Sequence, residues 1–339
     1  MLTERRFELL RASEASAPST LADDVRRGLA SAPRSIPPKH FYDAAGSELF
    51  DRICDLPEYY LTRAEHALLE RVAPRIADRT RATALLELGS GMARKTAPLL
   101  FALSSRARAH AGAAATVYVP LDISIDALEA CAASLVAELP GVSVRAVVGE
   151  FPRDVGRMAR AVPADASRPR LFAFLGSTMG NLDEVEAPAL VRAIAEEMAP
   201  RDAFLLGIDL VKDARVLLAA YDDAQGVTAL FNKNVLVVIN RELGADFDVA
   251  RFSHVALYDE ERARIEMHLR SEGAQRVHVA ALGMTLDIAD GERIRTEISR
   301  KFTRASAEAT LAAGGMVIDE WFEEDATFAL VLARRARRA

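Results

Sequence analysis

The stretch Leu85-Leu86-Glu87-Leu88-Gly89-Ser90-Gly91, followed by Met92-Ala93-Arg94-Lys95, decides the fold of this chain. Its first residues form a short apolar run, which is typical of a strand buried in a parallel sheet. Two glycines separated by one residue interrupt the run, and a helical pattern of leucines follows. A strand, a glycine turn and a helix allow backbone N–H groups to approach a nucleotide without an intervening Cβ. The stretch therefore predicts the floor of a cofactor site, although an ordinary tight turn has the same short pattern.

The composition is typical of a soluble globular protein. The chain has 339 residues, of which 50% are hydrophobic and 27% charged, and its formal net charge is −6. This balance disfavours a nucleic-acid surface, which needs a basic face. Cys54 and Cys131 form no CxxC pair and the histidines show no HxxxH or HxH spacing, so we expect neither a disulfide framework nor a metal site. No apolar window could span a membrane and no signal peptide is recognised, which favours a cytoplasmic protein.

Strands and helices alternate along the first two thirds of the chain. Four more strands are predicted by apolar runs at residues 116–122, 142–148, 171–175 and 203–208, with helical patterns between them. This spacing predicts a parallel sheet with right-handed crossovers and a ligand beyond the carboxyl ends of the strands. Four residues fall at such ends, namely Gly89, Asp122, Glu150 and Gly176.

The pattern changes after residue 211. Residues 212–242 are predicted to be mostly helical, and residues 260–299 to form antiparallel strands, because polar and apolar residues alternate there. The tail resumes the first pattern with a helix at 305–313 and strands at 316–321 and 327–333. Five strands, an insertion and a tightly joined final pair outline a class I S-adenosylmethionine-dependent methyltransferase.

We therefore predict an α/β, Rossmann-like fold with a seven-stranded mixed sheet and a second α+β domain. Residues 63–211 and 300–339 are predicted to form the cofactor domain. Residues 1–62 and 212–299, from the N-terminus and the insertion, are predicted to form the substrate domain. Within this scheme Thr62-Arg63-Ala64-Glu65 has the pattern of a capping box, so Glu65 is expected to cap the first turn of a helix.

Three residues bear on the identity of the cofactor. A dinucleotide site would have a third glycine, but that position holds Arg94. Lys95 could pair with the carboxylate of S-adenosylmethionine or be a solvated helix residue. Asp122 could accept hydrogen bonds from two ribose hydroxyls or cap the following helix. Together these features favour S-adenosylmethionine over a nicotinamide cofactor, and hence a methyltransferase over an oxidoreductase.

Five motifs occur in order along the chain. They are Tyr42-Asp43-Ala44-Ala45-Gly46-Ser47, Leu56-Pro57-Glu58-Tyr59-Tyr60-x-Thr62-Arg63, Glu87-Leu88-Gly89-Ser90-Gly91, Leu175-Gly176-Ser177-Thr178-Met179-Gly180-Asn181 and Glu297-Ile298-Ser299-x-Lys301-Phe302. In this combination, from about residue 36 onward, the chain resembles the L-histidine Nα-methyltransferases of ergothioneine biosynthesis. The resemblance implies an enzyme that binds L-histidine between two domains and methylates its α-amine three times, to hercynine. We expect it to be a monomer.

The resemblance also implies roles for individual residues. For the substrate, it implies that the carboxylate is held by Asn181 and Tyr221, that the amine is surrounded by Tyr42, Asn181 and the Gly176 backbone, and that the imidazole is read by Tyr59, Glu297 and Ser299 beside Met267. Tyr42 and Asn181 are thus the candidate catalytic residues. For the cofactor, the implied contacts are Gly89, Ser90, Gly91, Lys95, Asp122, Glu150 and Phe151. An aspartate is expected at residue 150, and the longer glutamate can still reach the adenine amino group.

The residues themselves agree in part. Glu297 and Ser299 are two apart in a strand-like run, so their side chains share one face and could bond both imidazole nitrogens. Without the resemblance, the pattern indicates an exposed charge on a strand for Glu297 and a core residue for Met267. It likewise indicates a helix N-cap for Asn181 and a packed helix residue for Tyr221. The matching set favours histidine over tryptophan as the acceptor, and an enzyme over a non-catalytic S-adenosylmethionine-binding protein.

Overall fold

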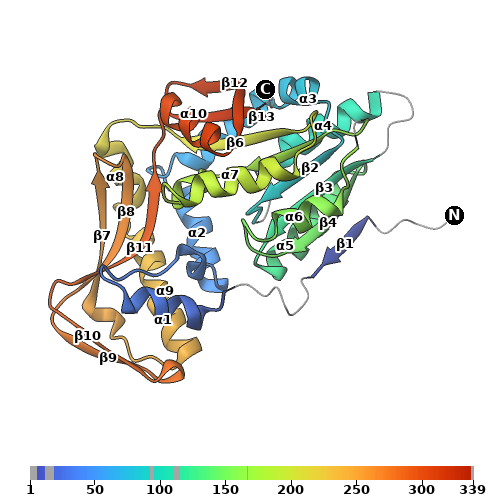
Figure 1. Cartoon of the computed structure of the whole chain (residues 1–339). Coiled ribbons are helices and arrows are strands. Elements are labelled where there is room, and N and C mark those ends of the chain that lie inside the picture. Colours follow the sequence, from blue (N-terminus) through green and yellow to red (C-terminus); the bar gives the residue numbers. More distant parts are fainter. Residues whose placement is uncertain (1–5, 12–18, 92–94, 110–114, 166, 337–339) are drawn as a thin grey trace. The chain divides into compact units, whose positions relative to one another are not determined.

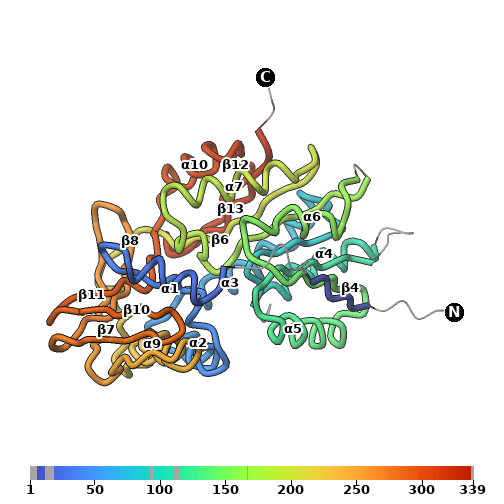
Figure 2. The backbone as a smooth tube through the Cα atoms, turned by 60° about the horizontal axis from the view of Figure 1, so that its bottom comes forward, coloured from blue at the N-terminus to red at the C-terminus, as the bar shows by residue number. Residues whose placement is uncertain are grey.

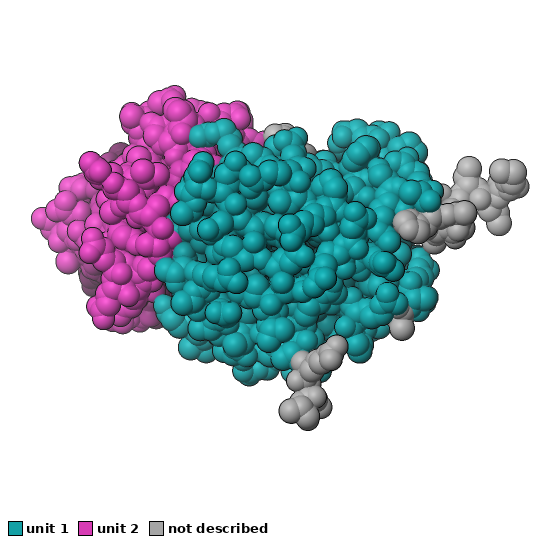
Figure 3. Space-filling model, turned by 90° about the horizontal axis from the view of Figure 1, so that it is seen from above, with its two compact units in different colours: residues 1–18, 62–210, 302–339 teal, residues 19–61, 211–301 magenta. Residues whose placement is uncertain are grey.

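The computed structural model describes residues 6–11, 19–91, 95–109, 115–165 and 167–336. The chain divides into two compact units (Figure 3). Unit 1 comprises Met1–Pro18, Thr62–Leu210 and Phe302–Ala339, and unit 2 comprises Ser19–Leu61 and Val211–Lys301. The three internal boundaries expected from the sequence lie within two residues of these.

An eight-stranded mixed sheet forms the centre of unit 1 (Figure 1). Its order is β1-β4-β3-β2-β5-β6-β13-β12. The strands are β1 (Phe7–Leu10), β2 (Ala84–Leu88), β3 (Thr116–Asp122), β4 (Val142–Val148), β5 (Arg170–Phe174), β6 (Ala203–Asp209), β12 (Met316–Glu324) and β13 (Phe328–Arg335). The first six are parallel, whereas β13 runs antiparallel to β6 and β12 antiparallel to β13.

Strand β1 corrects two expectations drawn from the sequence. The predicted sheet has seven strands, and β1 is the eighth: it pairs in parallel with β4, with Phe7 opposite Val144 (Figure 2). The predicted substrate domain includes the N-terminus, but β1 lies in the sheet of unit 1. Four residues in a polar, alanine-rich segment carry too little periodicity to predict a strand. They find their backbone partners at the open edge of β4.

Six helices among the described residues cover the two faces of this sheet. One face packs against α3 (Leu61–Thr80), α4 (Ala97–Ala109) and α5 (Ile125–Glu138), and the other against α6 (Val155–Ala161), α7 (Glu186–Glu197) and α10 (Arg304–Ala313). Successive side chains of β2 enter opposite cores, with Leu85 on the first face and Leu86 on the second. Burial on both faces is why the residues of β2, apart from Glu87, are apolar without alternation.

Unit 2 is built around its own hydrophobic core, which includes Phe41, Tyr221, Phe231 and Met267. Its helices are α1 (Leu21–Ala30), α2 (Ala44–Asp55), α8 (Ala214–Tyr221) and α9 (Val227–Leu243). A three-stranded antiparallel sheet has the order β11-β8-β7, and β10 pairs with β9. The strands are β7 (Phe252–Asp259), β8 (Arg264–Ser271), β9 (Gln275–Val279), β10 (Met284–Ile288) and β11 (Arg293–Arg300). The sequence did not predict β7, whose burial does not alternate cleanly along the strand.

Candidate functional site

The glycine turn after β2 has the backbone that the sequence predicts. Gly89 and Gly91 have φ angles of +64° and +49°, in the left-handed region that favours glycine. The Gly89 N–H donates to the Leu121 carbonyl at 2.8 Å, which ties the turn to the end of β3. Among the described residues, no atom lies within 4 Å of a Cβ built on Gly91, whereas Ser90 between the two glycines is buried. Arg94, which favours S-adenosylmethionine in the sequence argument, lies outside the described residues.

Asp122 holds the turn through its carboxylate. Its Oδ2 accepts a hydrogen bond from the Gly91 N–H at 2.9 Å, and its Oδ1 accepts one from the Ser124 N–H at 3.0 Å. Burial raises the pKa of Asp122, although these backbone donors oppose the shift. The following helix is capped by Ser124, whose Oγ accepts from the Ala127 N–H. Each carboxylate oxygen of Asp122 has a second acceptor position, which suits the two hydroxyls of a ribose.

The pair Glu150-Phe151 follows β4 and lies next to the same turn. The Glu150 N–H donates to Asp154 Oδ2 at 2.8 Å, which fixes the backbone where the pair begins. The Phe151 ring packs edge-on against Phe174, with ring centroids 5.0 Å apart. A Cβ on Gly89 would lie 3.6 Å from Phe151 Cε1. The aromatic ring therefore forms a wall beside the glycine turn.

Glu65 does not cap helix α3, and this corrects the capping-box prediction. The helix begins at Leu61, one residue before Thr62, and the Glu65 side chain is completely buried. Its Oε1 accepts from the Gly176 N–H at 2.7 Å, and its Oε2 lies 3.3 Å from Lys95 Nζ. Lys95 is therefore paired with a buried carboxylate and is not simply a solvated residue.

A second buried acid, Glu87, lies in β2 below the turn. Its carboxylate accepts from Thr96 Oγ1 at 2.7 and 2.9 Å and from the Tyr118 hydroxyl. Burial raises the pKa of Glu87 to about 7, and the nearby Glu65 adds to the shift while Lys95 opposes it. No role for Glu87 is predicted from the sequence, although an acid within an apolar strand indicates a buried carboxylate with hydrogen-bond partners.

The segment after β5 places Gly176 and Asn181. Gly176 and Ser177 have φ angles of +75° and +56°, so the chain turns sharply there. Ser177 Oγ accepts from the Asp209 N–H at 2.9 Å, and a short 3₁₀ helix, Thr178–Asn181, follows. Asn181 ends this helix and is half-buried, while Asp183 accepts from the N–H groups of Val185 and Glu186 next to α7. Because the Gly176 N–H is bonded to Glu65, its carbonyl is the backbone group of Gly176 suited to an amine.

A row of aromatic rings crosses unit 2. Tyr42 packs edge-on against Phe50, with ring centroids 5.5 Å apart, and Phe50 against Tyr59 at 6.1 Å. Tyr59 in turn packs edge-on against Tyr221 at 6.3 Å. The structure thus brings together three tyrosines that are predicted to face different parts of the substrate. Phe50, which lies on helix α2 and links two of the tyrosines, is not predicted from the sequence to belong to this row.

The hydroxyl of Tyr221 belongs to a buried triad. Tyr221 and Ser299 share a hydrogen bond of 2.7 Å, and Lys301 Nζ donates to the Tyr221 hydroxyl at 3.0 Å and to Ser299 Oγ at 2.9 Å. The ammonium also lies 4.6 Å from the centroid of the Tyr221 ring. Lys301 is 3% exposed, so a buried cation faces two residues of the predicted substrate site.

Strands β8 and β11 bring the remaining predicted residues together. Glu297 lies directly opposite Met267, and Ser299 opposite Ile265. The pairing shifts between Arg295 and Glu297, which is a β-bulge or irregularity of the kind that re-aims side chains near functional sites. Directly opposed residues of an antiparallel pair point to the same face, so the buried Met267 and the half-buried Glu297 share one face.

A buried polar chain fixes the end of helix α8. Thr296 Oγ1 donates to Asn232 Oδ1 at 2.6 Å, and Asn232 Nδ2 donates to His254 Nδ1 at 2.8 Å. His254 Nε2–H donates to the Tyr221 carbonyl at 2.8 Å. Burial lowers the pKa of His254, which favours the neutral ring that this chain of bonds requires. The chain therefore orients Tyr221 from its backbone, while the triad orients its hydroxyl.

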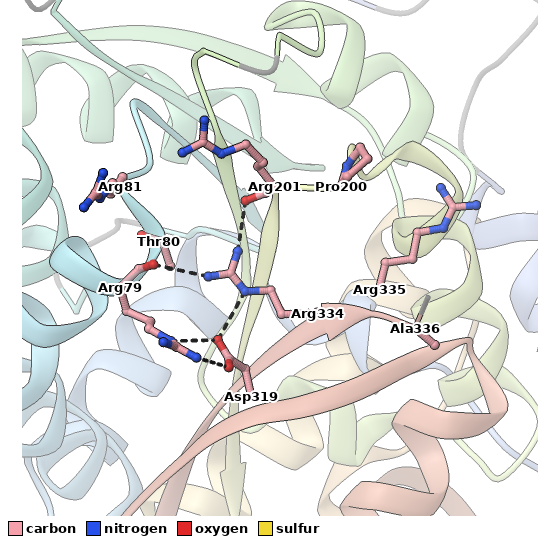
Figure 4. Close-up of a pocket in the computed structure, with 9 residues that line it drawn as sticks. All are labelled: Arg79, Thr80, Arg81, Pro200, Arg201, Asp319, Arg334, Arg335 and Ala336. Atoms are coloured by element: carbon pink, nitrogen blue, oxygen red, sulfur yellow. Dashed lines mark hydrogen bonds and ion pairs between the residues drawn. The ribbon is translucent and has the colours of Figure 1, made fainter. Parts of the chain in front are cut away.

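Two cavities lined by described residues of unit 1 lie away from the predicted site residues. One of about 800 Å³ is lined largely by arginines, and Arg334 there donates to Asp319 and to the carbonyls of Arg79 and Arg201 (Figure 4). Another, of about 850 Å³, lies beside α3 and α4 and contains no predicted site residue.

Among the described residues no group of histidine, cysteine and acidic side chains could hold a metal ion. None of the described helices is long and apolar enough to cross a membrane.

Residues 21–335 match the family of histidine-specific, SAM-dependent methyltransferases. The chain belongs to this family. It is 46% identical over 316 residues to a histidine N-alpha-methyltransferase of Mycobacterium tuberculosis, with 93% of this chain and 95% of that protein covered. A protein of the same name from Mycolicibacterium smegmatis is 44% identical over 321 residues, with 94% and 96% covered. Ergothioneine biosynthesis protein 1 of Neurospora crassa is 30% identical over 301 residues, which are 85% of this chain and 32% of that protein.

Members of this family use S-adenosylmethionine, and unit 1 of the enzyme fits it. No described residue fills the space beside Gly91, and Asp122 offers acceptors next to it. The Phe151 ring lies next to Gly89 of this turn, and the Lys95 ammonium lies next to Gly176, which follows β5. This donor set suits a carboxylate, a ribose and an adenine without requiring a diphosphate site.

Proposed function

We propose that the enzyme transfers three methyl groups from S-adenosylmethionine to the α-amine of L-histidine, forming hercynine in the first step of ergothioneine biosynthesis. The family and the names of the similar proteins support histidine as the acceptor. The observation that carries the proposal is the pairing of Glu297 with Met267 across two strands, with Ser299 two residues further and bonded to Tyr221. This face offers acceptor and donor groups beside an apolar wall, as a neutral imidazole requires.

In this proposal unit 1 binds the cofactor. The turn Gly89-Ser90-Gly91 approaches the methionine part, and the Lys95 ammonium pairs with its carboxylate. Asp122 accepts the two ribose hydroxyls, and the pair Glu150-Phe151 contacts the adenine. The glutamate at residue 150 is one methylene longer than the aspartate expected there, and still offers an acceptor to the adenine amino group.

Unit 2 supplies most of the proposed recognition of histidine. Tyr59, Glu297 and Ser299 would bond the imidazole beside Met267, and Tyr221 would bond the carboxylate. Asn181 would bond the carboxylate and the amine, and the Gly176 carbonyl would accept from the amine. Tyr42, the most exposed tyrosine of the aromatic row at 44% exposure, would face the amine. The proposed substrate site is polar where histidine is polar and apolar at the ring edge.

The proposed chemistry depends on orientation more than on acid–base catalysis. When bound, S-adenosylmethionine supplies an electrophilic methyl group on its sulfonium. In the first transfer Asn181 and the Gly176 carbonyl would accept hydrogen bonds from the two amine hydrogens, which would leave the lone pair free for the methyl group and fix the reacting atoms before the reaction. The amine must be neutral at each transfer, and its proton leaves to water. The ring of Tyr42 is suited to stabilise the final quaternary nitrogen through a cation–π contact.

One screen tests the proposed acceptor. The purified enzyme is incubated with S-adenosylmethionine and each of the twenty amino acids, and the products are weighed by mass spectrometry. We expect histidine alone to gain three methyl groups. A gain on tryptophan in place of histidine would support the alternative acceptor. S-adenosylmethionine binding without turnover of any amino acid would support a non-catalytic role.

A further inference from the structure

Glu65 connects two turns of unit 1 that the proposed function assigns to different ligands. Its Oε1 bonds the Gly176 N–H at 2.7 Å, and Gly176 belongs to the turn proposed to face the amine. Its Oε2 lies 3.3 Å from Lys95 Nζ, and Lys95 is proposed to pair with the cofactor carboxylate. We propose that Glu65 is a positioning residue that fixes the Lys95 ammonium and the Gly176 peptide in one arrangement.

The surroundings of Glu65 leave little freedom to this carboxylate. The side chain is 0% exposed, and a Cβ on Gly207 in β6 would lie 2.2 Å from its Oε1. A Cβ on Gly176 would lie 3.0 Å from Lys95 Nζ. Two glycines therefore provide the space in which the acid and the ammonium meet. A side chain at residue 207 would displace the Glu65 carboxylate, and Gly176 has in addition a φ angle of +75°, which favours glycine.

Stability alone does not explain the pair. Taking a carboxylate and an ammonium out of water costs free energy that their attraction roughly balances, so apolar residues of similar size would serve a purely structural role as well. The Lys95 side chain is 29% exposed, so its ammonium is partly accessible while its partner is not. This geometry holds the Lys95 ammonium at the edge of the proposed cofactor site and restricts the long, flexible side chain that carries it.

The variant Glu65→Gln separates positioning from packing. It keeps the shape of the side chain and an oxygen for the Gly176 N–H, but it removes the charge that faces Lys95. This inference rests on the proposed assignment of Lys95 to the cofactor carboxylate. The probes are therefore S-adenosylhomocysteine, which has that carboxylate, and 5′-methylthioadenosine, which lacks the amino-acid part. Isothermal titration measures both affinities without histidine, so the identity of the methyl acceptor does not affect the result.

We expect Glu65→Gln to weaken S-adenosylhomocysteine binding about tenfold, the usual effect of losing one charge-assisted contact. The affinity for 5′-methylthioadenosine should stay within about twofold of the wild type, since no carboxylate is involved. Lys95→Met should show the same pattern, and the double variant should lose no more than either single variant, because the two residues act as one unit. The control Glu70→Gln changes an exposed acid on the same helix and should alter neither affinity.

Equal weakening of both ligands by Glu65→Gln would indicate general damage and overturn the proposal. Unchanged binding of S-adenosylhomocysteine in either single variant, or additive losses in the double variant, would also overturn it. If Glu65→Gln does not fold, Glu65→Asp gives the same test, because it keeps the charge but withdraws it from Lys95 by one methylene. A several-fold selective loss for S-adenosylhomocysteine in that variant supports the proposal, and an equal loss for both ligands contradicts it.

Discussion

The hydroxyl oxygens of Tyr221 and Ser299 lie 2.7 Å apart, and the buried ammonium of Lys301 donates to both. An ammonium cannot accept a hydrogen bond, so both oxygens act as acceptors within this triad. One of the two hydroxyl protons lies between them, which makes the orientation of each hydroxyl depend on the other. Tyr221 is proposed to bind the substrate carboxylate and Ser299 the imidazole, so the triad links recognition of the two ends of histidine.

Replacing Lys301 tests this link. Lys301→Met removes the common donor but keeps the apolar stem, so both hydroxyls lose their fixed orientation. We expect KM for histidine to rise about tenfold, as for the loss of one hydrogen bond to a charged group, with a smaller effect on kcat. Steady-state kinetics at saturating S-adenosylmethionine measures both. Arg276→Met, at an exposed cation of the same unit, is the control. An unchanged KM in Lys301→Met would show that the triad does not orient the substrate.

Glu297 should determine which amino acid is accepted. In Glu297→Ala the imidazole N–H would lose the acceptor proposed for it, and the space beside Met267 would increase. A site that loses such a polar contact discriminates less between histidine and amino acids without ring nitrogens, by up to ~10⁴-fold in kcat/KM. We expect kcat/KM for histidine to fall and that for bulkier aromatic amino acids to rise in relative terms. Glu261→Ala, an exposed acid in the turn between β7 and β8, is the matched control. Histidine kinetics like those of the wild type would rule out the role of Glu297.

The buried acid Glu87 should make stability depend on pH. Its pKa is about 7 in the folded enzyme, against an ordinary value of 4.5. Between these values the folded state keeps a proton that the unfolded state releases, so raising the pH through this window lowers the free energy of unfolding. The difference amounts to about 3 kcal/mol.

Glu87→Gln removes the titrating group and should flatten this part of the profile. Chemical denaturation between pH 5 and pH 8 measures the free energy of unfolding of both proteins. We expect the wild type to lose more stability than the variant as the pH rises. Parallel profiles would contradict the assignment of a raised pKa to Glu87.

Asp122 should matter for cofactor affinity. Asp122→Asn places an N–H₂ group opposite one of the two backbone donors, Gly91 N–H or Ser124 N–H, and also removes an acceptor proposed for the ribose. We expect S-adenosylhomocysteine to bind at least about tenfold more weakly, measured by isothermal titration. Asp126→Asn, an exposed acid in the first turn of α5, should bind it normally. Normal binding by Asp122→Asn would remove Asp122 from the cofactor site.

The sequence was most informative where burial and backbone geometry act locally. The apolar run at β2 and the glycines after it predicted a buried strand and a turn, because burial on both faces and positive φ angles leave clear patterns. Glu65 was misread because Thr62-Arg63-Ala64-Glu65 also fits a helix start, and its true partners, Gly176 and Lys95, are distant in sequence. Lys301 and Phe50 were missed for the same reason: their roles depend on contacts that only the folded chain creates.

Product analysis tests the central claim most directly. The enzyme is incubated with L-histidine and excess S-adenosylmethionine, S-adenosylhomocysteine is quantified, and nuclear magnetic resonance locates the added methyl groups. We expect three molecules of S-adenosylhomocysteine for each histidine consumed, with all three methyl groups on the α-nitrogen. Methylation of a ring nitrogen, or the absence of any methylated histidine, would contradict it.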